Sequence, residues 1–288
     1  MTTPTLPNYI LTLSCPDRTG IVWRVTGFLL ERGGNVIDAD QFNDIETGLF
    51  FMRVHFSINR PDYELPRLRE EFQELGWEMS MSWELHDVAV KPRVIILVSQ
   101  HGHCLNDLLY RYRAGYLKVD IPAIVSNHMD FYQLAASYNI PFFHLAVTKE
   151  TKAQQEAKLI EIVREKGADL VVLARYMQIL SEGVCRELAG RAINIHHSFL
   201  PSFKGARPYD QAHLRGVKLI GATAHFVTTD LDEGPIIEQD VARVDHSMDP
   251  ETLTAIGRDV ECVVLARAVK WHSEHRVMLN GRKTVVFR

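Results

Sequence analysis

Cysteine is scarce in this chain, and its spacing indicates neither a disulfide framework nor a zinc site. The four cysteines among 288 residues lie far apart and form no C-x-x-C pair. Such spacing is more typical of reduced thiols in an intracellular protein. No apolar run reaches the roughly 18 residues that a membrane span needs. The start, MTTPTLPNYI, lacks the basic region and long apolar stretch of a signal peptide. We therefore expect a soluble, cytoplasmic protein with no membrane partner.

Two further features are missing, a strong excess of charge and a glycine-rich nucleotide fingerprint. The formal net charge is only −4, which gives no reason to expect nucleic acid or an anionic membrane as a partner. The stretch SQHGHCLND, which follows a strongly apolar run, has one glycine where the dinucleotide fingerprint G-x-G-x-x-G needs three. The sequence therefore does not predict a dinucleotide cofactor.

Lysine is absent from the first ninety residues, and this absence marks a domain boundary. Residues 1–90 contain 7 Arg, no Lys and 14 Asp or Glu, whereas the remainder contains 25 basic and 22 acidic residues. The change falls at HDVAVKPRV, just before the apolar stretch RVIILVSQ. We place one domain at residues 1–88 and a second at residues 89–288.

The first domain has the pattern of a ferredoxin-like sandwich, in the order β-α-β-β-α-β. Alternating apolar residues predict strands at 9–15, 35–44, 49–58 and 77–85. Apolar residues at helical spacing predict helices after Thr19, which is placed to cap the first of them, and at 64–75. No cluster of catalytic residue types occurs in this domain.

The second domain alternates strands and helices in the doubly wound, Rossmann-like manner. Apolar runs at 94–99, 120–127 and 169–174 predict parallel strands that are covered on both faces. Helices are predicted at 103–115, 129–138, 151–167 and about 250–274. The stretches AINIHH, IGATAHFVT and PIIEQDVARV predict further strands. In such sheets, ligands bind beyond the carboxyl ends of the strands.

An amide and two imidazoles lie at the end of one predicted strand, in NIHH. Asn194 and His196 alternate along this strand, so their side chains share one face, while Ile195 and His197 are predicted to point to the other. An amide and an imidazole are groups that polarise a carbonyl and move protons. A histidine on a strand is also often only a packed, hydrogen-bonded residue, and this alternative stays open.

A carboxylate follows about thirty residues later, in TDLDEGP. Asp232 precedes a Gly-Pro turn, and His225 lies in the strand that leads to it. Together with Asn194 and His196, Asp232 would complete a site for general acid-base chemistry. The alternative is that Asp232 contributes only to the turn.

A metal site is the other alternative for the histidines. The closest pairs are His101 with His103 and His196 with His197. Neighbouring strand residues point apart, and no carboxylate or cysteine lies at a helical ligand spacing to either pair. The sequence therefore predicts no metal.

Two separated stretches resemble a known family. NIHHSFLPSFKGARPY and GATAHFVTTDLDEGPII resemble the folate-dependent formyltransferase family, whose signature is N-x-H, then S-x-L-P, then a distant Asp before a turn. The match is closer to the formyltetrahydrofolate deformylases, the hydrolase branch, than to the glycinamide ribonucleotide transferases. The first domain resembles an ACT domain, with CPDRTGIV as its first loop. The resemblance, which runs from about residue 8 to the end, implies an ACT domain followed by a formyltransferase domain.

The resemblance implies a role for particular residues. Asn194, His196 and Asp232 match the catalytic residues of the family, and we expect Asn194 and His196 to polarise the formyl carbonyl and Asp232 to activate the attacking water. Four further positions match residues that line the folate pocket of the family, namely Gln178, Ile179, Leu180 and Val227. Arg207 is placed to hold the glutamate carboxylates of a folate or, alternatively, to be a surface charge. No cofactor is implied, because 10-formyltetrahydrofolate is the substrate.

The resemblance leaves three activities open. The transferases carry a Gly-Ser-Asn loop that holds the phosphate of their acceptor, whereas this chain has the bulkier His103 and Cys104 there. This departure favours hydrolysis of 10-formyltetrahydrofolate by water, with the formate serving one-carbon and purine metabolism. The alternatives are formyl transfer to an amine and a non-catalytic folate or amino-acid sensor.

The ACT resemblance also implies partners. We expect a homo-oligomer and an amino-acid effector, glycine or methionine. The loop CPDRTG and the next strand supply the expected effector residues Thr19, Gly20 and Asn35, since the amides at a helix start suit a carboxylate. Alternatively, Thr19 is only a helix cap and the domain serves only in assembly.

Overall fold

A computed structural model describes residues 6–60, 63–200 and 208–288. Contacts divide this part of the chain into two units. The first comprises the residues up to Lys91 together with Glu274–Met278 and Val285–Arg288, and the second comprises Pro92–Ser273 with Leu279–Thr284. The boundary lies close to the predicted one at residue 88. The predicted second domain, 89–288, is however interrupted, because Glu274–Met278 and Val285–Arg288 belong to the first unit.

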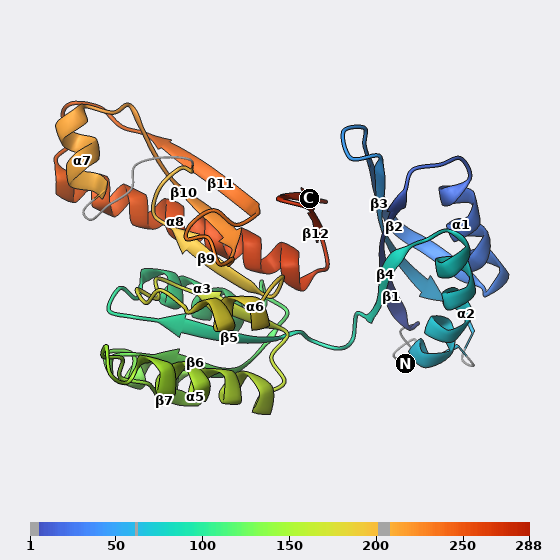
Figure 1. The fold of residues 1–288 in the computed structure, drawn as a ribbon, viewed down its shortest axis with the longest axis horizontal. Helices are drawn as coiled ribbons and strands as arrows, with labels where there is room; N and C mark the ends of the chain where they lie inside the picture. Colours follow the sequence, from blue (N-terminus) through green and yellow to red (C-terminus); the bar gives the residue numbers. More distant parts are fainter. Residues whose placement is uncertain (1–5, 61–62, 201–207) are drawn as a thin grey trace. The chain divides into compact units, whose positions relative to one another are not determined.

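The first unit has the predicted order of strands and helices. Its sheet has the order β2-β3-β1-β4 with antiparallel neighbours (Figure 1). The elements are β1 (Asn8–Pro16), α1 (Ile21–Glu31), β2 (Gly34–Asp44), β3 (Leu49–Ile58), α2 (Leu65–Glu78) and β4 (Ser82–Asp87). Apolar side chains of the sheet and of both helices form one buried core. This arrangement is the ferredoxin-like sandwich that the sequence predicts.

The end of the chain covers the other face of this sheet. This packing explains why C-terminal residues belong to the first unit. Phe51 is 1% exposed and clusters with Val285 and Phe287. Arg53, 2% exposed, forms an ion pair with Asp38 at 3.1 Å and donates to the Glu274 carbonyl at 3.1 Å. The apolar residues at the C-terminus thus form a second, separate apolar cluster of the first unit.

Two local predictions in this unit are corrected. Thr19 does not cap α1, because the N-cap is Gly20, whose φ of 90° carries the chain into the helix with no side-chain cap. The closing strand begins at Ser82, not at residue 77, because α2 continues to Glu78. Ser80 then adopts a positive φ of 52°, a backbone conformation that commonly ends a helix.

The second unit is a doubly wound domain. Its sheet has the order β11-β10-β9-β8-β5-β6-β7 (Figure 1). Strands β5 to β9 are parallel, and β10 is antiparallel to both of its neighbours. Its strands are β5 (Arg93–Val98), β6 (Asp120–Ser126), β7 (Phe142–His144), β8 (Leu170–Leu173), β9 (Ala192–His196), β10 (Leu219–Phe226) and β11 (Ile236–Arg243). The strand order leaves β9 and β10 side by side, with the reversal of direction between them.

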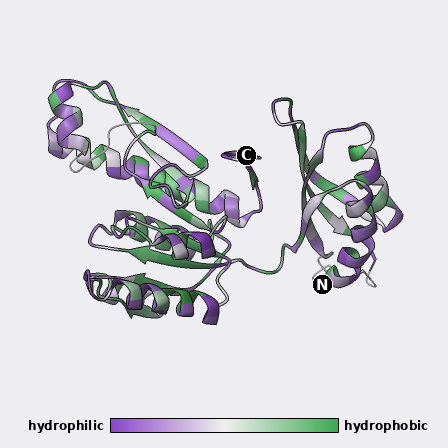
Figure 2. Cartoon of the chain, in the orientation of Figure 1, coloured by the Kyte–Doolittle hydropathy of each residue, from purple (hydrophilic) through white to green (hydrophobic). Residues whose placement is uncertain are grey.

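Helices cover this sheet, and the strands are buried as their composition predicts. β5 and β8 are almost wholly buried, and the central strands are hydrophobic in Figure 2. The helices are α3 (His103–Arg113), α4 (Tyr132–Ser137), α5 (Lys152–Glu165), α6 (Glu182–Glu187), α7 (Pro208–Arg215) and α8 (Pro250–Ser273). The hairpin β12 (Val277–Asn280) and β13 (Lys283–Val286) follows. None of the helices in the described ranges is long and apolar enough to cross a membrane.

The elements that the sequence pattern does not predict are all short. Strand β7 and helices α6 and α7 are too short for their periodicity to stand out. The hairpin β12–β13 is equally short. The long elements that position the active-site strands all occur where the sequence predicts them.

Candidate active site

The pairing of β9 with β10 places an amide beside two imidazoles. Asn194 lies opposite His225 in the antiparallel register, and His196 lies opposite Thr223. Asn194 Nδ2 is 3.3 Å from His225 Nε2. Thr223 is fully buried and donates to the Ser198 carbonyl at 2.9 Å. The hydroxyl thereby fixes the chain as it leaves β9, so the Asn194 and His196 side chains are held by backbone structure.

The loop after β10 returns to this pair and adds the carboxylate. Asp232 Oδ1 lies 3.4 Å from His196 Nδ1 and 3.7 Å from His225 Nε2. Asp232 has a φ of 57°, a conformation that costs free energy for a residue other than glycine and recurs at functional sites. The structure therefore brings the three predicted residues, Asn194, His196 and Asp232, to one place. It adds His225 as the imidazole that joins the amide to the carboxylate.

These imidazoles determine the charge of Asp232. Hydrogen bonding with His196, and then with His225, holds the pKa of the Asp232 carboxyl well below its usual range, although partial burial opposes this effect. The folded state therefore favours the carboxylate. Its contribution to stability is present above the ordinary pKa of aspartate and is lost as the pH falls toward the folded pKa. Asp232 is an anion at every pH near neutrality.

Gly234 allows the loop to return to β10. A Cβ at this position would lie 1.8 Å from the Phe226 carbonyl oxygen and 3.3 Å from His225 Nδ1. The backbone of the DEGP turn must therefore approach β10 more closely than any residue with a side chain allows.

We expect Gly234→Ala to displace the loop that carries Asp232. The backbone must shift to relieve the contact, so the free energy of unfolding should fall by about 1–3 kcal/mol, and activity should fall with it. Urea unfolding and a rate assay test this result. Gly183→Ala in α6 is the matched control, because a Cβ there meets no atom within 4 Å. Equal stability of the two variants would contradict the close approach.

The strand alternation predicts that His197 points away from His196, and this prediction is wrong. Strand β9 ends at His196, so the backbone leaves the extended conformation. The two rings stack, with centroids 4.9 Å apart and planes at 23°. Arg175 Nη1 donates to His197 Nδ1 at 2.6 Å. Burial, and then the charge of Arg175, lowers the pKa of His197 to about 4, so this imidazole is neutral near pH 7.

A pocket of about 740 Å³ opens beside these residues, within the second unit. Its lining includes the predicted catalytic residues and the four predicted folate residues, Gln178, Ile179, Leu180 and Val227. It also includes Arg282, which no sequence motif indicated, since it lies fifty residues beyond Asp232 in the chain. Arg207 lies outside the described residues.

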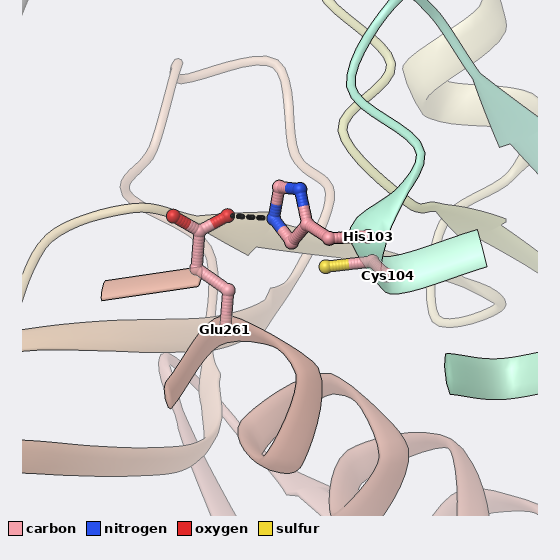
Figure 3. Close-up of side chains that lie close together, drawn as sticks. All are labelled: His103, Cys104 and Glu261. Atoms are coloured by element: carbon pink, nitrogen blue, oxygen red, sulfur yellow. Dashed lines mark hydrogen bonds and ion pairs between the residues drawn. The ribbon is translucent and has the colours of Figure 1, made fainter. Parts of the chain in front are cut away.

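A second group of metal-ligand types lies between α3 and α8 (Figure 3). Ligand atoms of His103, Cys104 and Glu261 lie within 4.8 Å of one another. Glu261 lies at no helical spacing from His103 or Cys104, so the sequence pattern does not indicate it. His103 Nε2 lies 2.8 Å from Glu261 Oε2, a hydrogen-bond distance that makes these two groups partners of each other.

The predicted effector residues of the first unit do not come together within the chain. In the sheet register Asn35 lies level with Asn8, the first residue of β1, whereas Thr19 and Gly20 follow Pro16, the last. The length of β1 separates the two ends of the sheet by about 25 Å. The expectation that Asn35 shares a ligand with Thr19 and Gly20 in one chain is therefore wrong. Thr19 and Gly20 remain exposed at the start of α1.

Comparison with known families defines the class of protein. Residues 92–269 match the family model described as formyl transferase, and residues 9–72 match the ACT domain model. These ranges correspond to the doubly wound domain with the Asn-His-Asp site and to the ferredoxin-like domain. The protein is thus an enzyme with the formyltransferase fold and an N-terminal ACT domain.

Individual relatives narrow this class. The chain is 49% identical to a formyltetrahydrofolate deformylase from Corynebacterium sp., over 98% of each chain. The crystal structure of a formyltetrahydrofolate deformylase from Burkholderia mallei has a TM-score of 0.94 at 56% identity, covering 98% of this chain and 100% of that one. Glycinamide ribonucleotide transformylase 1 from Symbiobacterium toebii has a TM-score of 0.65 at 29% identity and covers 71% of this chain and 98% of that one. This chain belongs to the formyltetrahydrofolate deformylase family.

Proposed function

We propose that the protein hydrolyses 10-formyltetrahydrofolate to formate and tetrahydrofolate. The observation that carries this proposal is the position of Asp232, between two imidazoles and beside Asn194, at a pocket large enough for a folate. Relatives that match the whole chain are named for this reaction. The formate would serve one-carbon and purine metabolism in the cytoplasm.

In the proposed reaction, water adds to the formyl carbon and the bond from that carbon to the folate nitrogen breaks. Asn194 donates a hydrogen bond to the oxyanion that forms, an interaction typically worth about 10²–10³ in rate. One proton must leave the attacking water, and one must reach the departing nitrogen. His196 shares a strand face with Asn194. It can accept the proton that leaves the water and donate it to the departing nitrogen. The products are the secondary amine of tetrahydrofolate and formic acid, which loses its proton to solvent to become formate.

Asp232 supports this transfer as a fixed anion. Because its pKa is held well below the usual range, it is a weak proton acceptor and acts mainly by orienting the water and His196. The developing positive charge on His196 is stabilised by a carboxylate oxygen 3.4 Å away. A carboxylate, an imidazole and an amide supply all the groups this reaction needs, so we propose that it uses no metal and no cofactor.

Formate release in an amine-free buffer with a chelator tests the proposal. We expect many equivalents of formate per enzyme, with tetrahydrofolate formed in equal amount. A requirement for an amine would favour formyl transfer, and loss of turnover with the chelator would indicate a metal. Release of at most one equivalent would favour a folate-binding sensor.

We also propose that the ACT domain assembles the protein into a homo-oligomer whose rate responds to glycine or methionine. The exposed loop at Thr19 and Gly20, with the free amides of a helix start, supports a carboxylate ligand there. Rate and molar mass should be measured on the full chain with each amino acid. The full chain is needed because Glu274–Met278 and Val285–Arg288 pack in the first unit. A monomer, or a rate unchanged by either amino acid, would contradict the proposal.

A further inference from the structure

A buried carboxylate lies behind the active site and holds an arginine. Glu261, on α8, is 1% exposed. Its Oε2 lies 3.4 Å from Nε of Arg175, whose side chain is 11% exposed. Tyr209 donates its hydroxyl to Glu261 Oε1 at 2.8 Å, and His103 lies 2.8 Å from Oε2. A buried carboxylate is costly unless it is paired and hydrogen-bonded, and here two side chains hydrogen-bond to it and the arginine pairs with its charge.

The arginine extends from this carboxylate to the active site. Arg175 follows β8 and has a φ of 64°, a left-handed conformation that is costly for a residue other than glycine and persists where the surroundings enforce it. Its Nη1 donates to His197 Nδ1. Since Nδ1 accepts this bond, the proton of neutral His197 is on Nε2. The His197 ring stacks on His196, so the contacts run without a gap from Glu261 to the catalytic imidazole.

We propose that Glu261 and Arg175 are positioning residues that, through His197, fix the ring of His196 and keep a neutral imidazole beside it. This inference rests on the proposed hydrolysis, in which His196 carries the proton. A protonated His197 would place a positive charge against a group that must itself accept a proton. Arg175 opposes this protonation in two ways, because its N–H occupies Nδ1 and its positive charge lowers the pKa of His197.

The electrostatics of His197 support this assignment. The charged and titratable groups that face it are Arg175, His196, Glu261 and Asp232. Burial and then Arg175 lower its pKa, whereas Glu261 and Asp232 raise it. Removal of the Arg175 charge should therefore move the pKa of His197 upward, toward the ordinary value of about 6.5. Removal of the Glu261 charge should move it further down.

The same groups do not favour a cation at Glu261. Figure 3 shows the His103 ring directed at the carboxylate, with the Cys104 thiol beside them. The carboxylate oxygens already have Tyr209, His103 and the Arg175 cation as partners. A hydrogen bond with Cys262, then burial, keeps the pKa of the Cys104 thiol well above its usual value, and a metal ligand must be a thiolate. The cluster is better suited to hold an arginine than a metal ion.

The test is the pH dependence of formate release by the full-length protein. Arg175→Gln should move the acid limb of the pH profile to higher pH and lower the rate at about pH 5.5 relative to the wild type, because burial still opposes protonation of His197 but the Arg175 charge no longer does. Arg175→Lys keeps the charge and should restore the wild-type profile on the acid side. Glu261→Gln should lower kcat by about tenfold at every pH with KM for the folate unchanged, because it removes orientation without touching the pocket. Arg267→Gln is the control, since Arg267 is on the same helix and pairs instead with Asp240 and Glu238.

The outcomes separate this inference from the proposed reaction. If the wild-type protein releases no formate, the reaction itself is wrong. If the wild type is active and the pH profile of Arg175→Gln is the same as that of the wild type, the positioning role is wrong. Profiles that shift equally in Arg267→Gln, or activity of Glu261→Gln that returns on addition of zinc, would also overturn it.

A nitrogen-15 NMR titration of the wild-type protein gives the answer without any variant, because we expect His197 to be neutral with its proton on Nε2 at about pH 6. A proton on Nδ1 would contradict the inference.

Discussion

Asp232→Asn is expected to bind folate as the wild type does and to turn over at least about a hundredfold more slowly. The amide has the volume of the carboxylate, so the pocket keeps its shape. What is lost is the negative charge 3.4 Å from His196 Nδ1. Without it, the positive charge that develops on the imidazole is no longer stabilised, and the attacking water loses the anion that orients it. The measurements are folate affinity at equilibrium and kcat for formate release.

The control for this variant is Asp259→Asn, an exposed aspartate on α8. It makes the same chemical change outside the pocket and should leave kcat as in the wild type. Because the depressed pKa of Asp232 also contributes to stability at neutral pH, urea unfolding of both variants should accompany the assay. If Asp232→Asn loses affinity in step with its rate, then Asp232 serves binding and not the chemical step.

Asn194→Ala is the second large effect, with an expected fall in kcat of about 10²–10³. The amide is the donor to the oxyanion, a group that exists only after water has added to the formyl carbon. Its loss should therefore lower kcat and kcat/KM together while KM stays near its original value.

The structure gives a second reason to test Asn194. Its Nδ2 is 3.3 Å from His225 Nε2, so the alanine variant also leaves that imidazole with one partner fewer. Asn106→Ala in α3 removes an exposed amide that bonds only to the Gly102 carbonyl among the contacts described, and serves as the control. A fall in affinity with kcat preserved would show that Asn194 holds the folate and does not act on the transition state.

The sequence predicts those parts of the site that follow from local pattern. Asn194 and His196 alternate on a strand that periodicity identifies, and their shared face follows from that alternation. The predicted opposite direction of His197 was wrong because the strand ends one residue earlier. The alternation rule applies only while the backbone is extended. Asp232 was singled out by its place before a Gly-Pro turn and matched to a catalytic residue by resemblance, and the close packing at Gly234 explains how its loop returns to the site.

The groups behind the site could not be predicted, because they depend on contacts between distant segments. Glu261 and His103 are 158 residues apart in the chain, and no spacing rule connects them. Arg175 is an ordinary surface type in the sequence, and only its backbone conformation and its burial show otherwise. Likewise, Phe287 comes from the end of the chain to cluster with Phe51 in the first unit. Patterns within a segment predict elements, whereas packing between elements decides which side chains meet.

The most direct test of the central claim is a single turnover in water labelled with oxygen-18, with enzyme in excess over 10-formyltetrahydrofolate and no amine or free metal ion present. Hydrolysis by water at the Asn194–His196–Asp232 site predicts one labelled oxygen in each formate and an equal amount of tetrahydrofolate, at the rate of the steady state. The Asp232→Asn variant should give the same products about a hundredfold more slowly. Persistence of the formyl group on the folate until an amine is added, with no labelled formate released, would contradict the account.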